Sequence, residues 1–158
     1  MEYVTLNNGI KMPILGFGVY QIPREETKKC VLDAIKVGFR AIDTAQSYFN
    51  ESEVGDALVE SGIPRSEFFI TTKVWIDNYG YDKCKASVEE SLKKLKTDYI
   101  DLVLLHQPFS DYYGTYRDIE DLEPDAIVLD GLAIRGGDMD SNQSDTVINW
   151  LESLGFYE

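Results

Sequence analysis

The stretch IDLVLLHQP, residues 100–108, contains the only histidine of the chain and is the best starting point for the fold. Its apolar run, broken by one aspartate, is typical of a strand that is buried on both faces of a parallel sheet. A lone histidine after such a strand is more often structural than functional. In parallel sheets, however, active sites lie at the carboxyl ends of the strands. His106 therefore needs polar neighbours from other strand ends if it is to have a chemical role.

Strand-like and helix-like segments alternate along the rest of the chain. An Asn-Gly turn at residues 7–9 predicts a small hairpin over residues 4–12. The expected strands are residues 14–19, 39–43, 68–73, 100–106 and 126–129, and the expected helices open at Pro23, at the capping box 50–53, near Asp82, near Tyr116 and near Ser144. Five βα units after a small N-terminal β-hairpin predict an α/β fold with a parallel sheet. That sheet is either a partial (half) TIM barrel or an open, doubly wound, flavodoxin-like sheet.

Composition limits the class of protein and its partners. The 158 residues amount to one domain, and 44% apolar with 27% charged residues is an ordinary globular balance. The net charge of −13 argues against nucleic acid and anionic membranes as partners. We find no signal segment and no run long enough to span a bilayer, so the prediction is a cytoplasmic protein. Cys30 and Cys84 are expected to be small, buried, apolar residues in a reducing compartment.

Four polar residues are predicted to meet at one edge of the sheet. Asp43, Lys73 and His106 end three successive strands, and Tyr48 lies in the loop beyond the first of them. A tyrosine can protonate the alkoxide that forms when a hydride reduces a carbonyl, although its ordinary pKa of about 10 makes it a weak acid. A neighbouring ammonium stabilises the phenolate, a carboxylate holds the ammonium, and a neutral imidazole orients the carbonyl oxygen. The competing reading is that an Asp–Lys pair only stabilises the strand ends.

Several segments in order resemble the signatures of the aldo-keto reductases. They are GFGVY (16–20), GFRAIDTAQSY (38–48) with NESEVG (50–55), TKVW (72–75) and LKKLKTDYIDLVLLHQP (92–108). The resemblance implies NADPH as cofactor and an aldehyde or ketone as substrate. It makes Tyr48 the acid, assisted by Lys73 and Asp43, with His106 directing the substrate. It further assigns the substrate pocket to Tyr20, Phe49 and Trp75, and cofactor binding to Gly18, Val19 and Asp43. No metal site is predicted.

The resemblance covers about residues 1–122. Residues 118–158 hold eleven acidic residues and one basic residue, Arg135, so they account for −10 of the net charge of −13. We therefore predict a single α/β domain in which a reductase-like half barrel, residues 1–122, is joined to an acidic βα segment of different origin, residues 123–158. Such a chain is truncated, chimeric or engineered. The family segments that bind most of the cofactor have no match here, so weak or absent reductase activity is expected.

Other readings of the function remain open at this point. The chain is alternatively an engineered or chimeric fold without catalytic function, or a small flavodoxin-like binding module. Residues 16–24 do not resemble a flavin phosphate loop, which disfavours the module. Asp130, Asp138 and Asp140 are read as solvated acids rather than as a magnesium site. Because a half barrel leaves strand edges and its inner face uncovered, the prediction is either a homodimer that covers the open edges or the open, doubly wound sheet.

Overall fold

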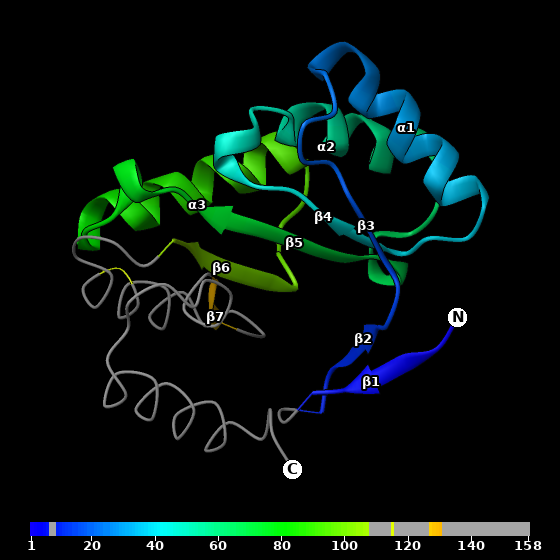
Figure 1. Cartoon of the computed structure of the whole chain (residues 1–158), viewed down its shortest axis with the longest axis horizontal. Coiled ribbons are helices and arrows are strands. Elements are labelled where there is room, and N and C mark those ends of the chain that lie inside the picture. The colour runs from blue at the N-terminus through cyan, green and yellow to red at the C-terminus, as the bar shows by residue number, and fades with distance from the viewer. Residues whose placement is uncertain (7–8, 108–114, 116–126, 131–158) are drawn as a thin grey trace, which may run out of the picture.

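The computed structural model describes residues 1–6, 9–107, 115 and 127–130 (Figure 1). The elements in chain order are β1 (Tyr3–Thr5), β2 (Lys11–Pro13), β3 (Gly16–Gly18), α1 (Arg24–Lys36), β4 (Ala41–Asp43), η1 (Gln46–Tyr48), α2 (Glu51–Glu60), η2 (Arg65–Glu67), β5 (Phe69–Val74), η3 (Ile76–Asn78), α3 (Tyr81–Leu95), β6 (Leu102–His106) and β7 (Ile127–Asp130). The helices predicted near residues 116–122 and 145–154 lie outside the described residues. No helix in the described part of the chain is both long and apolar enough to cross a membrane.

The sheet decides between the two predicted architectures. Strands β3 to β7 are parallel and lie in sequence order, β3-β4-β5-β6-β7, while β1 and β2 form a separate antiparallel hairpin. Helices α1, α2 and α3 lie together on one side of the sheet, each packed against the next (Figure 1). A doubly wound sheet reverses its strand order and has helices on both faces. The fold is therefore that of a partial TIM barrel with an N-terminal hairpin, and the doubly wound alternative is wrong.

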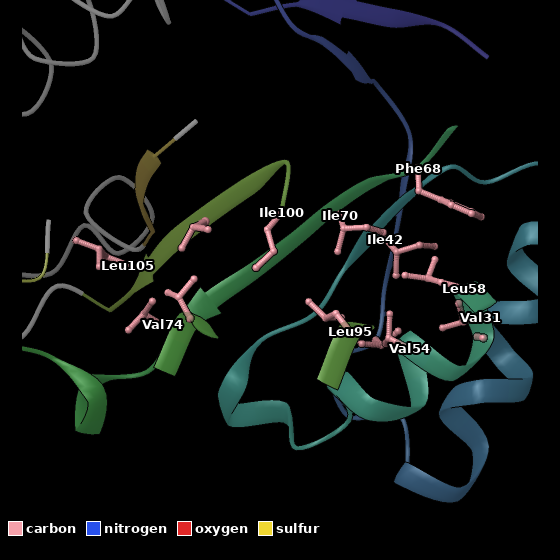
Figure 2. Packing of buried hydrophobic residues seen from close by; sticks show 14 of the residues in the cluster. Val31, Ile42, Val54, Leu58, Phe68, Ile70, Val74, Leu95, Ile100 and Leu105 are labelled. Carbon is pink, nitrogen blue, oxygen red and sulfur yellow. The ribbon is translucent and has the colours of Figure 1, made fainter. Parts of the chain in front are cut away.

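The main core lies between the sheet and the helices. Because side chains alternate along a strand, Ile42, Ile70 and Val74 all point toward the helix layer (Figure 2). The helices contribute their apolar stripes, which include Val31, Val54, Leu58, Cys84, Val88 and Leu95. Burial of one such aliphatic side chain is worth about 1.5–3 kcal/mol. Cys84 is buried as predicted, whereas Cys30 is only half-buried because Val31 takes the inward position beside it.

The opposite, inner face of the sheet changes character along the strands. At the amino ends of β4, β5 and β6 it is apolar, with Ala41, Phe69 and Leu102 buried. The hairpin packs over them through Leu6, Ile10 and Met12. The inner face is therefore covered at this end, contrary to the expectation that it lies uncovered. Asp43 lies two residues beyond Ala41 on the same face, and Lys73 and His106 lie four residues beyond Phe69 and Leu102, so the functional candidates lie at the carboxyl edge.

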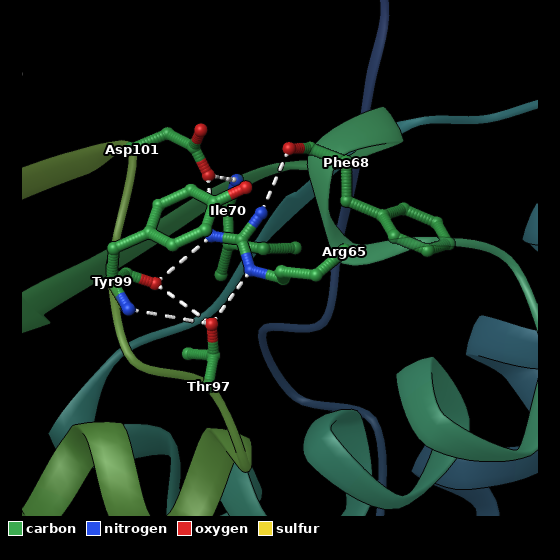
Figure 3. A network of polar contacts seen from close by, with 6 residues as sticks. All are labelled: Arg65, Phe68, Ile70, Thr97, Tyr99 and Asp101. Atoms are coloured by element: carbon green, nitrogen blue, oxygen red, sulfur yellow. Dashed lines mark hydrogen bonds and ion pairs between the residues drawn. The ribbon is translucent and has the colours of Figure 1, made fainter.

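One arginine joins two loops at the amino end of the sheet (Figure 3). Arg65 donates to Thr97 Oγ1 at 2.8 Å, to the carbonyl of Phe68 at 2.9 Å and to the carbonyl of Tyr99 at 3.0 Å. It also pairs with Asp101 at 2.6 Å, and its guanidinium lies 4.0 Å from the centre of the Tyr99 ring. The side chains of Arg65 and Asp101 are only 19% and 13% exposed, so the pair is shielded from water. This network fixes the loop before β5 to the loop before β6.

Replacement of Arg65 by lysine is expected to lower the free energy of unfolding by about 1–2 kcal/mol. Lysine keeps the charge but lacks the planar fork that reaches several acceptors at once. Urea unfolding followed by circular dichroism measures the loss. The matched control is Arg24→Lys, because Arg24 is 66% exposed and pairs with Glu53 on the surface; it should change stability by less than about 0.5 kcal/mol. Equal losses in the two variants would contradict a special role for Arg65.

Candidate active site

The four predicted polar residues come together at the carboxyl edge of the sheet. Asp43 ends β4, Lys73 lies next to last in β5, His106 ends β6, and Tyr48 ends η1 just after β4. Lys73 Nζ lies 2.6 Å from Asp43 Oδ1 and 3.2 Å from the Tyr48 hydroxyl. The rings of Tyr48 and His106 meet edge to face, with centroids 5.9 Å apart. Residues far apart in the sequence thus form one cluster.

Lys73 is the buried centre of this cluster. It is 6% exposed, and its ammonium donates to Asp43, to the Tyr48 hydroxyl and, at 3.0 Å, to the carbonyl of Thr44. An ammonium has three protons, so each of them has a partner. A buried charge without such partners would be costly. The positive charge consequently lies against the phenol oxygen, where it stabilises negative charge on that oxygen.

Asn50 holds the loop that leads to Tyr48. It is the N-cap residue of α2 as predicted, but its side chain makes no capping hydrogen bond, so the predicted capping box is wrong in its contacts. Instead, its Oδ1 accepts from Thr44 Oγ1 at 3.0 Å, and its Nδ2 donates to the carbonyl of Val19 at 3.0 Å and to Thr27 Oγ1 at 3.4 Å. Asn50 is 1% exposed. Its amide therefore ties the loop to α1 and to the segment after β3.

His106 is half-buried among aromatic and hydroxyl side chains. The Trp75 ring lies edge to face at 5.3 Å, and Ser47 Oγ lies 3.5 Å from Nδ1. The Tyr79 hydroxyl donates to the carbonyl of His106 at 3.1 Å. These contacts fix both the ring and the backbone at the end of β6. A fixed imidazole beside Tyr48 suits the predicted role of orienting a carbonyl oxygen.

The three predicted pocket residues lie around the cluster in different ways. Tyr20 is 64% exposed, and its ring lies 4.9 Å from that of Tyr48. Trp75 is half-buried against His106, so both residues flank the four-residue cluster. Phe49 follows Tyr48 with a left-handed backbone, φ 58°, and is 79% exposed. Such strained positions cost about 1–3 kcal/mol and gather at functional sites.

The segment predicted to bind the cofactor runs beside Asp43. Gly18 pairs with Asp43 in the parallel register, and a side chain at Gly18 would meet nothing within 4 Å. Val19 differs, since it is fully buried in the main core. Its N–H donates to the carbonyl of Asp43 at 3.0 Å, and its carbonyl accepts from Asn50. The open surface for a cofactor in this segment is therefore at Gly18 and the Asp43 carboxylate, which is 40% exposed.

The sequence alone gave no role in the site to several residues that support it. Gln46, Ser47, Asn50 and Tyr79 all contact the elements that hold Tyr48, Trp75 or His106. Gln46 and Ser47 lie inside the GFRAIDTAQSY segment, but nothing in one sequence separates them from its other polar residues. A side-chain amide has no pattern that tells which distant groups it will bind. Only the packing of η1 against η3 and α3 shows this.

The same fold and motifs occur in known proteins. The sequence model of the aldo/keto reductase family matches residues 14–136, and this match extends beyond the boundary predicted near residue 122. The different origin of residues 123–158 stays a prediction. Glyoxal reductase of Bacillus subtilis is 46% identical over 126 residues, which are 78% of this chain and 46% of that protein. The chain spans less than half the length of the curated relatives it matches.

Solved structures agree with these matches. An aldo/keto reductase from Brucella melitensis superimposes with a TM-score of 0.80 at 36% identity, covering 94% of this chain and 58% of that one. An aldo-keto reductase from Bombyx mori, in complex with NADP, has a TM-score of 0.76 at 33% identity and covers 80% and 50% of the two chains. The present chain shares with these proteins its parallel strands in sequence order and its motifs at the carboxyl edge. The matches therefore show that the chain belongs to the aldo-keto reductase family.

Proposed function

We propose that the chain is a reductase of small aldehydes or ketones that uses NADPH. The observation that carries this proposal is the continuous contact from Asp43 through Lys73 to the Tyr48 hydroxyl, beside His106. In this arrangement a proton donor is held next to a buried positive charge and an orienting imidazole. Those groups are what the reduction of a carbonyl requires from the protein. The name of the Bacillus subtilis relative supports a short, reactive aldehyde as substrate.

The residues fit the cofactor that this family implies. The Asp43 carboxylate accepts a hydrogen bond from Lys73 through Oδ1, and its side chain stays 40% exposed. An ionised carboxylate has further acceptor positions, so it can accept hydrogen bonds from sugar hydroxyls. Gly18 lies beside it with open space where a side chain would be, so a ligand can approach the backbone closely. Gly18 and Asp43 would hold the ribose next to the nicotinamide. When bound, NADPH supplies the hydride for the carbonyl carbon.

The protein's own residues then handle the oxygen of the substrate. His106 orients the carbonyl oxygen toward the Tyr48 hydroxyl. Tyr48 gives its proton to that oxygen as negative charge develops on it. The ammonium of Lys73 stabilises the phenolate that remains, and Asp43 holds this ammonium in place. Tyr20 and Trp75 provide apolar walls on either side of the reacting groups.

Titration of NADPH into the purified chain tests this function. Cofactor fluorescence reports binding, light scattering reports molar mass, and glyoxal is the first substrate to assay. Light scattering is included because the sequence predicts a homodimer. We expect a Kd for NADPH below about 1 mM, the upper end of usual KM values, and slow oxidation of NADPH with glyoxal.

Two tyrosine variants sharpen this assay. Tyr48→Phe should bind NADPH but lose turnover about 10²–10⁴-fold, because the proton donor is gone. Tyr99→Phe is the matched control at the opposite end of the sheet, where the Tyr99 ring lies on Arg65. It should leave turnover unchanged. Absence of binding at millimolar NADPH, or equal turnover in the Tyr48 variant and the wild type, would overturn the proposed function.

A further inference from the structure

Gln46 makes four hydrogen bonds that join three elements of the candidate site. Its Oε1 accepts from the backbone N–H of Trp75 at 2.9 Å and from Asn78 Nδ2 at 2.8 Å. Its Nε2 donates to Ser87 Oγ at 3.1 Å and to Ser91 Oγ at 3.3 Å. The amide has two donor protons and two acceptor positions, so all of them are used. Gln46 thus connects η1 to η3 and to α3.

The η3 turn also reaches the strand end that carries His106. It follows Trp75 directly and is closed by the N–H of Asn78 on the carbonyl of Trp75, at 2.9 Å. Tyr79, the next residue, is 7% exposed and donates to the carbonyls of His106 and Gln107 at 3.1 and 3.2 Å. The η3 turn is therefore held on one side by Gln46 and on the other by Tyr79.

This geometry links the position of the acid to that of the imidazole. Tyr48 lies two residues after Gln46 in the same 3-10 turn, and its ring meets His106. The backbone N–H of Trp75 donates to Gln46 Oε1, and the Trp75 indole also meets His106. A shift of η1 relative to η3 would change both ring contacts together. One fully satisfied amide, half-buried at this junction, prevents that shift.

We propose that Gln46 is a positioning residue of the reductase site, which sets Tyr48 and Trp75 against His106 without touching the substrate. The assignment of roles to Tyr48 and His106 rests on the proposed function, whereas the positioning itself is measurable without turnover. Where glyoxal turnover is measurable, Gln46→Met lowers kcat/KM by about 10- to 100-fold, mainly through kcat, because small misplacements of reacting groups are costly. Methionine keeps the length of the side chain but makes none of the four hydrogen bonds.

A fluorescence double-mutant cycle on the full chain tests the positioning. The chain has two tryptophans, so Trp150→Phe leaves Trp75 as the only tryptophan that emits. The His106 ring meets the Trp75 indole edge to face with centroids 5.3 Å apart, and an imidazole this close to an indole quenches its emission. His106→Gln should therefore raise Trp75 emission. In the Gln46→Met background this increase should fall at least about twofold, because the two sites are coupled.

Three further variants separate positioning from general stability. Gln46→Glu retains an acceptor oxygen for the Trp75 N–H and the Asn78 amide. In this variant, the increase in Trp75 emission on His106→Gln should therefore return to its size in the chain with Gln46. Asn78→Ala removes one of these contacts and should lower the effect less, which covers the case that Gln46→Met does not fold. Thr97→Ala removes hydrogen bonds at the opposite end of the sheet and should leave the effect unchanged.

The outcomes of the cycle are distinct from those of the NADPH titration. An increase in Trp75 emission on His106→Gln that is as large in the Gln46→Met background as in the chain with Gln46 overturns the proposal. So does an equal decrease in Thr97→Ala, and so does the absence of any effect of His106→Gln in the otherwise unchanged chain. A chain that binds no NADPH but shows the coupled fluorescence would refute the proposed function and leave the positioning role of Gln46 intact.

Discussion

Replacement of Lys73 by methionine is expected to lower kcat for glyoxal reduction by about 10²–10⁴-fold, the usual contribution of a general acid. Methionine retains most of the length and the apolar stem of lysine. It removes the charge that contacts the Tyr48 hydroxyl at 3.2 Å and the Asp43 carboxylate at 2.6 Å. The phenolate that forms on proton transfer then has no adjacent positive charge. The expected loss is in kcat rather than in KM, because the charge acts on the transition state.

The measurement is steady-state oxidation of NADPH by glyoxal, with cofactor binding followed separately. Lys29→Met is the matched control, because Lys29 lies on the surface of α1, where its ammonium pairs with Asp33 and its side chain is 82% exposed. The control should keep the wild-type rate. A Lys73→Met variant that retains kcat within about twofold would show that Tyr48 does not depend on the ammonium.

Gly55→Ala is expected to lower the free energy of unfolding by about 3 kcal/mol, the upper part of the usual range for an overpacked core. Gly55 lies in α2 where this helix crosses the end of α3. A Cβ at this position would lie 2.3 Å from the carbonyl oxygen of Lys94 and 2.7 Å from the carbonyl carbon of Leu95. Both are backbone atoms, so no side chain can rotate away. The two helices must move apart, and Leu95, which is fully buried, must move with α3.

Urea unfolding of the wild type and of the Gly55→Ala variant measures this difference. Gly18→Ala is the matched control, since a Cβ there meets nothing within 4 Å and its φ is not left-handed. The same substitution should therefore cost little at Gly18. The larger Gly55→Val change should leave little folded protein. A Gly55→Ala chain as stable as wild type would mean that the α2–α3 crossing relaxes easily.

Local sequence patterns determined the elements and the location of the cluster. The Asn-Gly turn placed the hairpin, and the apolar runs placed all five strands within a few residues. Period-two alternation also puts Asp43, Lys73 and His106 on the inner face, because each lies an even number of residues from a buried inner-face residue of its strand. Since parallel strands end at one edge, the meeting of these side chains follows from their positions in the sequence.

Tertiary packing decided the strand order and the use of the supporting polar residues. Alternating strands and helices are compatible with both a barrel and a doubly wound sheet, because periodicity defines an element but not its neighbour. Asn50 has the sequence context of a helix cap, yet its amide binds Thr44 and Val19 instead. Gln46 and Gly55 likewise owe their roles to contacts with α3, which begins more than twenty residues later. Hydrogen bonds and steric contacts between distant segments exist only once the helices have packed on the sheet, so no local pattern can specify them.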